Sequence, residues 1–127
     1  PDKGTLSSFQ VISTLPEGWD SDSKSTAEIR MTQDGRFLYA SNRGHNSLAI
    51  FSVNDDGTLT AKGHQPTEAI PRFFDLDPTG NFILSVGQNS GHLSTYKIDH
   101  ESGQLEQMER FEVGKSPLWI QFVEKQP

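Results

Sequence analysis

The amino-acid sequence predicts an all-β protein that forms part of a β-propeller, and three observations indicate this fold class. A repeat of 45 residues runs through the chain, because placing Gly35 over Gly80 superimposes residues 36–39 on 81–84. Glycines recur where tight hairpins need them, and no stretch shows the apolar periodicity of an amphipathic helix. Four short strands in about 45 residues is the spacing of a propeller blade.

The first complete blade is expected at about 27–64. Its strands, from the innermost outwards, are predicted at 27–32, 36–41, 47–53 and 58–64. Asp34-Gly35 separates the first two strands, and Asp56-Gly57 separates the last two. Glycine readily adopts the positive φ that a tight hairpin requires, so both pairs predict turns at the same end of the blade.

The second complete blade is expected at about 72–112. Its strands are predicted at 72–77, 81–86, 92–98 and 104–112. Thr79-Gly80 and Ser102-Gly103 occupy the same two turns as the Asp-Gly pairs of the first blade. The same hairpin chemistry therefore applies to both copies of the repeat.

Partial copies at both ends predict the edge strands of two neighbouring blades. Residues 4–6 match 57–59, so 5–14 is expected to be the outer strand of a preceding blade. Residues 117–120 match 71–74, so 117–123 is expected to be an inner, closing strand. Two blades cannot close a ring, since propellers use about four to eight. We therefore expect one partial domain, 1–127, from the C-terminal part of a ring whose other blades are missing or belong to another chain.

Composition restricts the classes of partner and cofactor. The net charge of −6 argues against nucleic acid or an anionic membrane, because both favour a basic surface. No apolar run approaches the length of a transmembrane helix. The absence of cysteine excludes thiolate metal sites and fits a reducing compartment, so a cytoplasmic location is expected. Neither a metal nor another cofactor is expected, because the four histidines lack ligand spacing; they are His45, His64, His92 and His100.

Strand order places a candidate site at the end of the blades opposite the glycine turns. The inner strand of each blade lines the axial channel, and Glu28 and Arg72 stand near the starts of these strands. Arg43 and Gln88 follow the second strands, so all four side chains are expected around one mouth of the channel. Arginine forks bind phosphate or carboxylate, and a carboxylate can activate water.

Simpler interpretations of these residues remain open at this stage. Glu28 and Arg43 could pair with each other to satisfy buried charge, and Arg72 could be a solvated loop residue. The histidines are more typical of surface or loop positions than of metal ligands. His45 alone shares the loop of Arg43 and is kept as a candidate. The link 16–26 is longer than its counterpart in the next repeat, as expected of a loop that serves a binding face.

Several segments resemble one known family. Residues 32–43, Thr-Gln-Asp-Gly-Arg-Phe-Leu-Tyr-Ala-Ser-Asn-Arg, resemble the blade signature of the seven-bladed lactonase propellers. Residues 65–72, 86–90 and 114–119 are similar to segments of the bacterial propeller-type 6-phosphogluconolactonases. The resemblance runs from about residue 4 to residue 123 and aligns with the C-terminal third of that family.

The resemblance implies a pentose phosphate pathway enzyme that hydrolyses 6-phosphoglucono-1,5-lactone to 6-phosphogluconate. It implies Glu28, Arg43 and Arg72 as catalytic residues, and we add Gln88, His45 and Lys115 as candidates for binding the small anionic sugar lactone. The fold also hosts carboxymuconate cyclases, and many propellers are non-catalytic binding modules, so both remain alternatives. Two blades alone are expected to be inactive.

Overall fold

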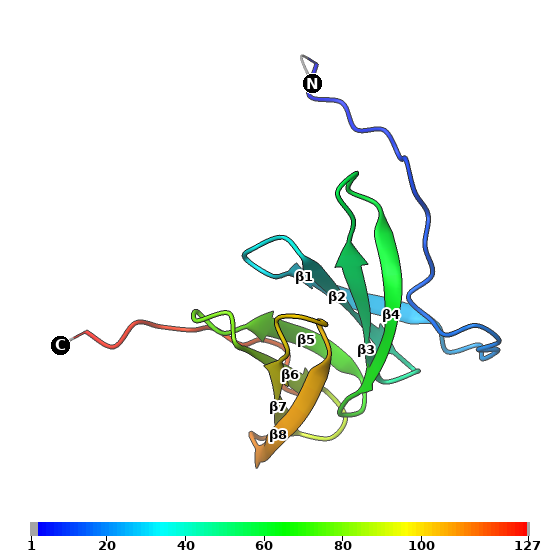
Figure 1. Ribbon diagram of the computed structural model, residues 1–127. Coiled ribbons are helices and arrows are strands. Elements are labelled where there is room, and N and C mark those ends of the chain that lie inside the picture. Colours follow the sequence, from blue (N-terminus) through cyan, green and yellow to red (C-terminus); the bar gives the residue numbers. More distant parts are fainter. Residues whose placement is uncertain (1–2, 127) are drawn as a thin grey trace.

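The computed structural model describes residues 3–126, in which eight strands form two four-stranded antiparallel sheets (Figure 1). The first sheet contains β1 (Ser25–Met31), β2 (Phe37–Arg43), β3 (Ser47–Val53) and β4 (Leu59–Pro66), in that order. The second contains β5 (Pro71–Leu76), β6 (Phe82–Gly87), β7 (His92–Ile98) and β8 (Leu105–Glu112). The two predicted blades are confirmed, and none of the strand boundaries predicted within them differs from the observed one by more than two residues.

Antiparallel pairing of consecutive strands makes each sheet a meander. Tight turns join β1 to β2 and β3 to β4, and their counterparts recur in the second sheet. Each turn holds a glycine with φ between 72° and 83°, as predicted; these are Gly35, Gly57, Gly80 and Gly103. Within the described part of the chain, no helix has the length and apolarity that a membrane span requires.

The main hydrophobic core joins the two sheets, because buried side chains of both blades belong to one cluster. Each blade contributes four buried residues, which are Phe37, Tyr39, Leu48 and Ile50 from the first and Phe74, Ile83, Tyr96 and Ile98 from the second. Alternation along β2 and β3 sends successive side chains to opposite faces. A smaller cluster of Ala40, Ala49 and Phe51 therefore forms on the other face of the first blade.

Polar contacts fix the second blade against the first at the hairpin end. The hydroxyl of Tyr39 donates to the carbonyl oxygen of Gly103 at 2.8 Å, and Arg36 donates to the carbonyl oxygen of His100 at 3.0 Å. Two constraints favour glycine at position 103. Its φ is positive, and a Cβ there would collide with the ring of Phe37. The β7–β8 turn thus packs directly on the first blade.

The two predicted edge strands, 5–14 and 117–123, are not strands in the structure. A strand requires a hydrogen-bonded neighbour, and the blades that would supply one lie outside this chain. Residues 5–14 instead follow β4, where the side chain of Gln10 exchanges two hydrogen bonds with the backbone of Leu59. Only the two ends of the described chain extend away from the sheets (Figure 1). Their role as edge strands stays a prediction for the complete ring.

Removing the Tyr39 hydroxyl should weaken the contact between the blades. In the full-length protein, Tyr39→Phe should lower the free energy of unfolding by about 1–2 kcal/mol, because the Gly103 carbonyl loses a buried donor. Tyr96→Phe is the matched control, since the Tyr96 hydroxyl lies 3.4 Å from the Pro66 carbonyl oxygen and should contribute less. Urea unfolding measures both, and equal losses would contradict this assignment.

Candidate functional site

The candidate site is built on β-bulges at the starts of the two inner strands. On β1, the register shifts between Thr26 and Ile29, so that Ala27 and Glu28 stand opposite one residue of β2. On β5, the register shifts between Pro71 and Phe73, which leaves Arg72 as the extra residue. Bulges bend a strand and redirect side chains, and they are common beside active sites. Glu28 and Arg72 therefore leave the regular ladder near the start of each inner strand, at adjacent positions of the repeat.

Glu28 is held by its neighbours on β1 and β2. Its backbone N–H donates to the hydroxyl of Ser41 at 3.0 Å, which satisfies an amide that the bulge removes from the ladder. Its Oε1 accepts from the backbone N–H of Ile29 at 3.0 Å and from Arg30 Nη1 at 2.5 Å. The carboxylate is half-buried and ion-paired, with one oxygen fixed in direction.

Arg30 links the inner strands of the two blades. Besides Glu28, it contacts Asp75 of β5, with 2.9 Å between Nε and Oδ1. Arg30 and Asp75 occupy the same place in the 45-residue repeat, so equivalent positions of adjacent blades carry opposite charges. Sequence reasoning missed this pair, although the register of the repeat, combined with the opposite signs, could have indicated it.

Arg43 ends β2 beside the bulge of β1. Its Nη2 donates to the carbonyl oxygen of Thr26 at 2.9 Å. Its Nε is buried and has no hydrogen-bond partner among residues 3–126. The alternative that Glu28 and Arg43 neutralise each other is wrong, because Glu28 pairs with Arg30.

Arg72 is positioned by a strained residue two places before it. Ile70 has a φ of 57°, which is unusual for a β-branched residue and costs about 1–3 kcal/mol. Its N–H donates to the side-chain oxygen of Asn46, while its carbonyl accepts from the N–H groups of Arg72 and Gln88. These contacts come from loops of both blades and fix the chain where Arg72 begins. The Arg72 side chain is exposed, yet it lines the cleft.

Glu28, Arg43 and Arg72 line one open cleft of about 440 Å³. The remaining lining residues are Thr26, Ala27, Phe73, Leu118 and Trp119. The cleft therefore combines two guanidinium groups, one carboxylate and an aromatic wall. Such a set can bind a phosphate or carboxylate group beside a group able to accept a proton from water.

Gln88 and Lys115 do not join this cleft. Both line a neighbouring hollow of about 500 Å³, formed by the β6–β7 turn and the segment after β8. Strand order placed Gln88 at the same mouth of the channel as Glu28, and a role of Gln88 or Lys115 in substrate binding stays a prediction for the complete ring. The backbone N–H of Gln88 donates to the carbonyl oxygen of Ile70 at 3.0 Å.

His45 packs against aromatic rings and is absent from the lining of the Arg43 cleft. Its ring makes edge contacts with Trp19 at 4.5 Å and with His64 at 5.4 Å, and its Nδ1 lies 2.6 Å from the Ser47 hydroxyl. Burial, and then the nearby His64, lower the pKa of His45. The residue therefore anchors Trp19, and with it the link 16–26, to the first blade. A role in substrate binding stays a prediction.

A half-buried carboxylate outside the cleft, that of Glu68, was not anticipated from the sequence. Glu68, in the loop between the blades, accepts from Arg110 Nε at 2.5 Å and from the Ser94 hydroxyl at 2.9 Å. Arg110 is the main reason that the pKa of Glu68 falls to about 2. A side chain on Gly87 would collide with the Cβ of Glu68, so the two backbones approach each other closely here. This ion pair fastens the inter-blade loop to the outer strands of the second blade.

Metal binding finds no support in the described part of the chain. Among residues 3–126, no three His, Asp or Glu side chains are grouped closely enough to hold a metal ion.

Three comparisons relate the chain to known proteins. A family model described as lactonase, 7-bladed beta-propeller, matches residues 1–122. A 6-phosphogluconolactonase from Pectobacterium carotovorum is 44% identical over 118 residues, which are 92% of this chain and 35% of that protein. The crystal structure of a protein from Lactobacillus plantarum superimposes with a TM-score of 0.90 at 37% identity, over 97% of this chain and 36% of that one.

A periplasmic gluconolactonase from Pseudomonas aeruginosa is also similar. Its structure superimposes with a TM-score of 0.77 at 33% identity, over 87% of this chain and 31% of that one. The chain thus spans about a third of the length of the proteins it matches.

The Glu68–Arg110 pair should make stability depend on pH. Because the folded pKa of about 2 lies below the ordinary 4.5, the contribution is complete above pH 4.5 and is lost as the pH falls toward 2. Because the Arg110 side chain is half-exposed and screened by solvent, this contribution should amount to only about 1 kcal/mol. Glu68→Gln in the full-length protein should remove this contribution at pH 7 and flatten the acid limb of the stability profile.

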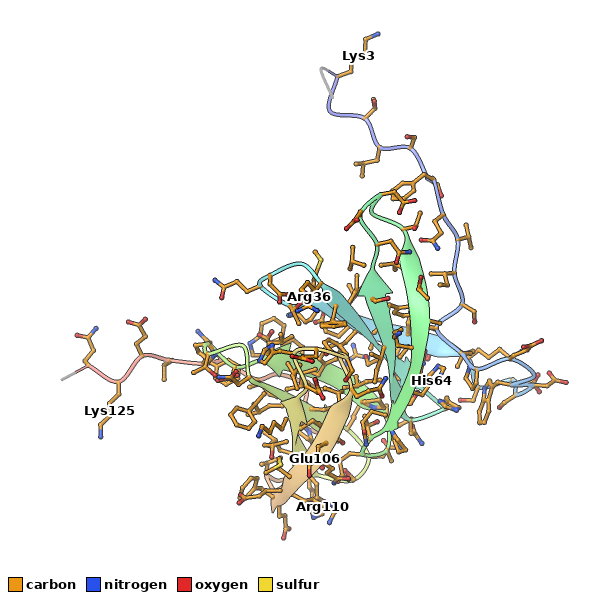
Figure 2. All side chains as sticks on the ribbon, viewed as in Figure 1. Lys3, Arg36, His64, Glu106, Arg110 and Lys125 are labelled. Carbon is orange, nitrogen blue, oxygen red and sulfur yellow. The ribbon has the colours of Figure 1, made fainter. Side chains whose placement is uncertain are left out.

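Glu106→Gln is the matched control for that experiment. Glu106 lies exposed on β8, the strand that also carries Arg110 (Figure 2). Urea titrations at several pH values between 3 and 7 compare the two variants. An acid limb as steep in Glu68→Gln as in the parent would show that this ion pair does not govern acid stability.

Proposed function

The chain belongs to the seven-bladed β-propeller lactonase family, and from that premise we propose that the protein containing it hydrolyses 6-phosphoglucono-1,5-lactone to 6-phosphogluconate. The observation that carries the proposal is the cleft that Glu28, Arg43 and Arg72 share. The curated relative from Pectobacterium carotovorum bears the name of this activity. The reaction is a step of the pentose phosphate pathway, and the absence of cysteine suits the reducing cytoplasm.

Glu28 has the properties of a general base in this reaction. Its Oε1 is occupied by Arg30 and by the Ile29 amide, so Oε2 is the oxygen left to take a proton from water. The water oxygen bonds to the lactone carbonyl carbon, and the ring C–O bond then breaks. The departing alkoxide takes up a proton, giving the acid and a hydroxyl group. A placed base typically contributes about 10²–10⁴-fold to such a step.

The two arginines have separate tasks in the proposed mechanism. One binds the phosphate of the substrate, and the other stabilises the negative charge that develops on the carbonyl oxygen. Each such donor is typically worth ~3 kcal/mol. Arg43 and Arg72 both line the cleft, and Arg72 is exposed at a bulge, so both can bind an anionic group there. The net charge of −6 repels the substrate at long range, so the positive groups must act locally.

This chain supplies only part of the proposed site. It holds two blades and spans about a third of its relatives, so channel residues of the other blades are needed to complete the cleft. The proposal therefore concerns the complete ring. A binding module without catalysis and a carboxymuconate-type cyclase are the competing outcomes of the tests below.

Activity of site variants in the full-length ring tests the proposal. Glu28→Gln should lower kcat/KM for the phosphorylated lactone by about 10²–10⁴-fold. Arg43→Ala and Arg72→Ala should each lower it by about 10²-fold. Acid release followed with a pH indicator measures the rate above buffer hydrolysis. Arg36→Ala is the control. Arg36 precedes β2 and Arg43 ends it, so the two arginines lie at opposite ends of the blade, and the Arg36→Ala variant should retain activity.

Two results would contradict the proposal. Turnover by the parent protein that does not exceed the buffer rate would favour a binding module. Turnover of carboxymuconate in place of the phosphorylated lactone would favour a cyclase.

The substrate phosphate is tested separately with unphosphorylated glucono-1,5-lactone. The Pseudomonas aeruginosa relative is named as a gluconolactonase, so this comparison is direct. If an arginine binds the phosphate, its alanine variant should lose most of the preference for the phosphorylated lactone. A preference unchanged in both variants would assign phosphate binding to other residues.

A further inference from the structure

The cleft has an aromatic wall that the proposed mechanism does not use. Glu28, Phe73 and Trp119 occupy the same position in three successive copies of the repeat, and all three line the cleft. Corresponding positions of adjacent inner strands lie at the same height along the channel of a propeller. The carboxylate is therefore followed around the rim by two aromatic rings.

The two rings are stacked, and the inner one is fixed. Phe73 is 3% exposed, and its ring lies 4.4 Å from that of Trp119 with an interplanar angle of 30°. Arg30, which also binds Glu28, has its guanidinium carbon 5.5 Å from the centre of the Phe73 ring. The aromatic wall is thus tied to the carboxylate through one arginine.

The outer ring belongs to the cleft lining. Phe73 covers one face of the Trp119 indole, and Trp119 lines the cleft together with Arg72 and Glu28. Binding pockets for small molecules characteristically combine aromatic walls with a few placed polar groups. An indole offers a flat apolar face, and a pyranose-like ring presents aliphatic C–H groups on its own faces. The two surfaces are complementary in shape and polarity.

We propose that Trp119, supported by Phe73, is the platform that binds the sugar-ring face of the substrate in this cleft. The inference rests on the proposed function and adds the residue that selects a cyclic sugar phosphate over a simple anion. Arginines and a carboxylate recognise charge, which inorganic phosphate also carries. Trp119 recognises the carbon skeleton that inorganic phosphate lacks.

Ligand binding to the full-length ring tests this assignment. Glucose 6-phosphate serves as a stable cyclic sugar phosphate, and inorganic phosphate serves as the anion without a ring. Trp119→Leu keeps apolar bulk without a flat ring, and Trp119→Ala removes both. By calorimetry, both variants should bind glucose 6-phosphate about tenfold more weakly, because the sugar ring no longer buries its apolar face on the indole. Their affinity for inorganic phosphate should be unchanged.

Tryptophan fluorescence gives a second measurement, which would not respond to the ligand if Trp119 had only a structural role. Glucose 6-phosphate should change the tryptophan emission of the parent protein in a saturable way. The change should vanish in Trp119→Phe and persist in Trp19→Phe, the matched control, since Trp19 packs on His45 away from the cleft. Inorganic phosphate should produce a much smaller change.

The outcomes separate this inference from the proposed function. If the parent hydrolyses the lactone but Trp119→Leu and Trp119→Ala bind glucose 6-phosphate normally, the platform is wrong and the function stands. The platform is also wrong if both variants lose both ligands equally, or if the emission change survives in Trp119→Phe. If the parent neither hydrolyses the lactone nor binds glucose 6-phosphate, both assignments fall.

Discussion

The interruption of the inner strands by β-bulges is the constraint on which the candidate site depends. In a regular ladder, side chains alternate between the two faces of a blade, and both faces are needed for packing. The bulges at Glu28 and Arg72 release these residues from that alternation near the start of each inner strand, at adjacent positions of the repeat. Ser41 and the strained Ile70 then satisfy the backbone groups that the bulges leave unpaired.

Packing between the blades keeps the two bulges in a fixed relation. The core between the sheets and the Tyr39–Gly103 hydrogen bond hold the hairpin end, while Arg30 and Asp75 join the inner strands nearer the cleft. Arg30 belongs to both systems, because it also orients Glu28 and covers Phe73. The side chain of Arg30 therefore contributes both to the contact between the blades and to the geometry of the site. A repeat protein can carry such a site because only a few positions depart from the repeat.

The blades were predictable because hairpin glycines such as Gly35 and Gly80 recur at the spacing of the repeat and mark the same turn in each blade. The grouping of Glu28, Arg43 and Arg72 followed from strand order alone. The bulges could not be predicted from strand order. The residues within them are alanine, glutamate and arginine, and none of these residue types is characteristic of a bulge. The positive φ of Ile70 could not be predicted for a related reason. β-branched residues rarely adopt a positive φ, and here the conformation is held by a hydrogen bond to Asn46 of the other blade.

A crystal structure of the full-length ring with bound glucose 6-phosphate tests the central claim most directly. The account predicts the phosphate within hydrogen-bonding distance of Arg43 or Arg72, the sugar ring over Trp119, and C1 facing the Glu28 carboxylate. A ligand bound at another mouth of the channel, or a ring in which these side chains point away from one another, would contradict it.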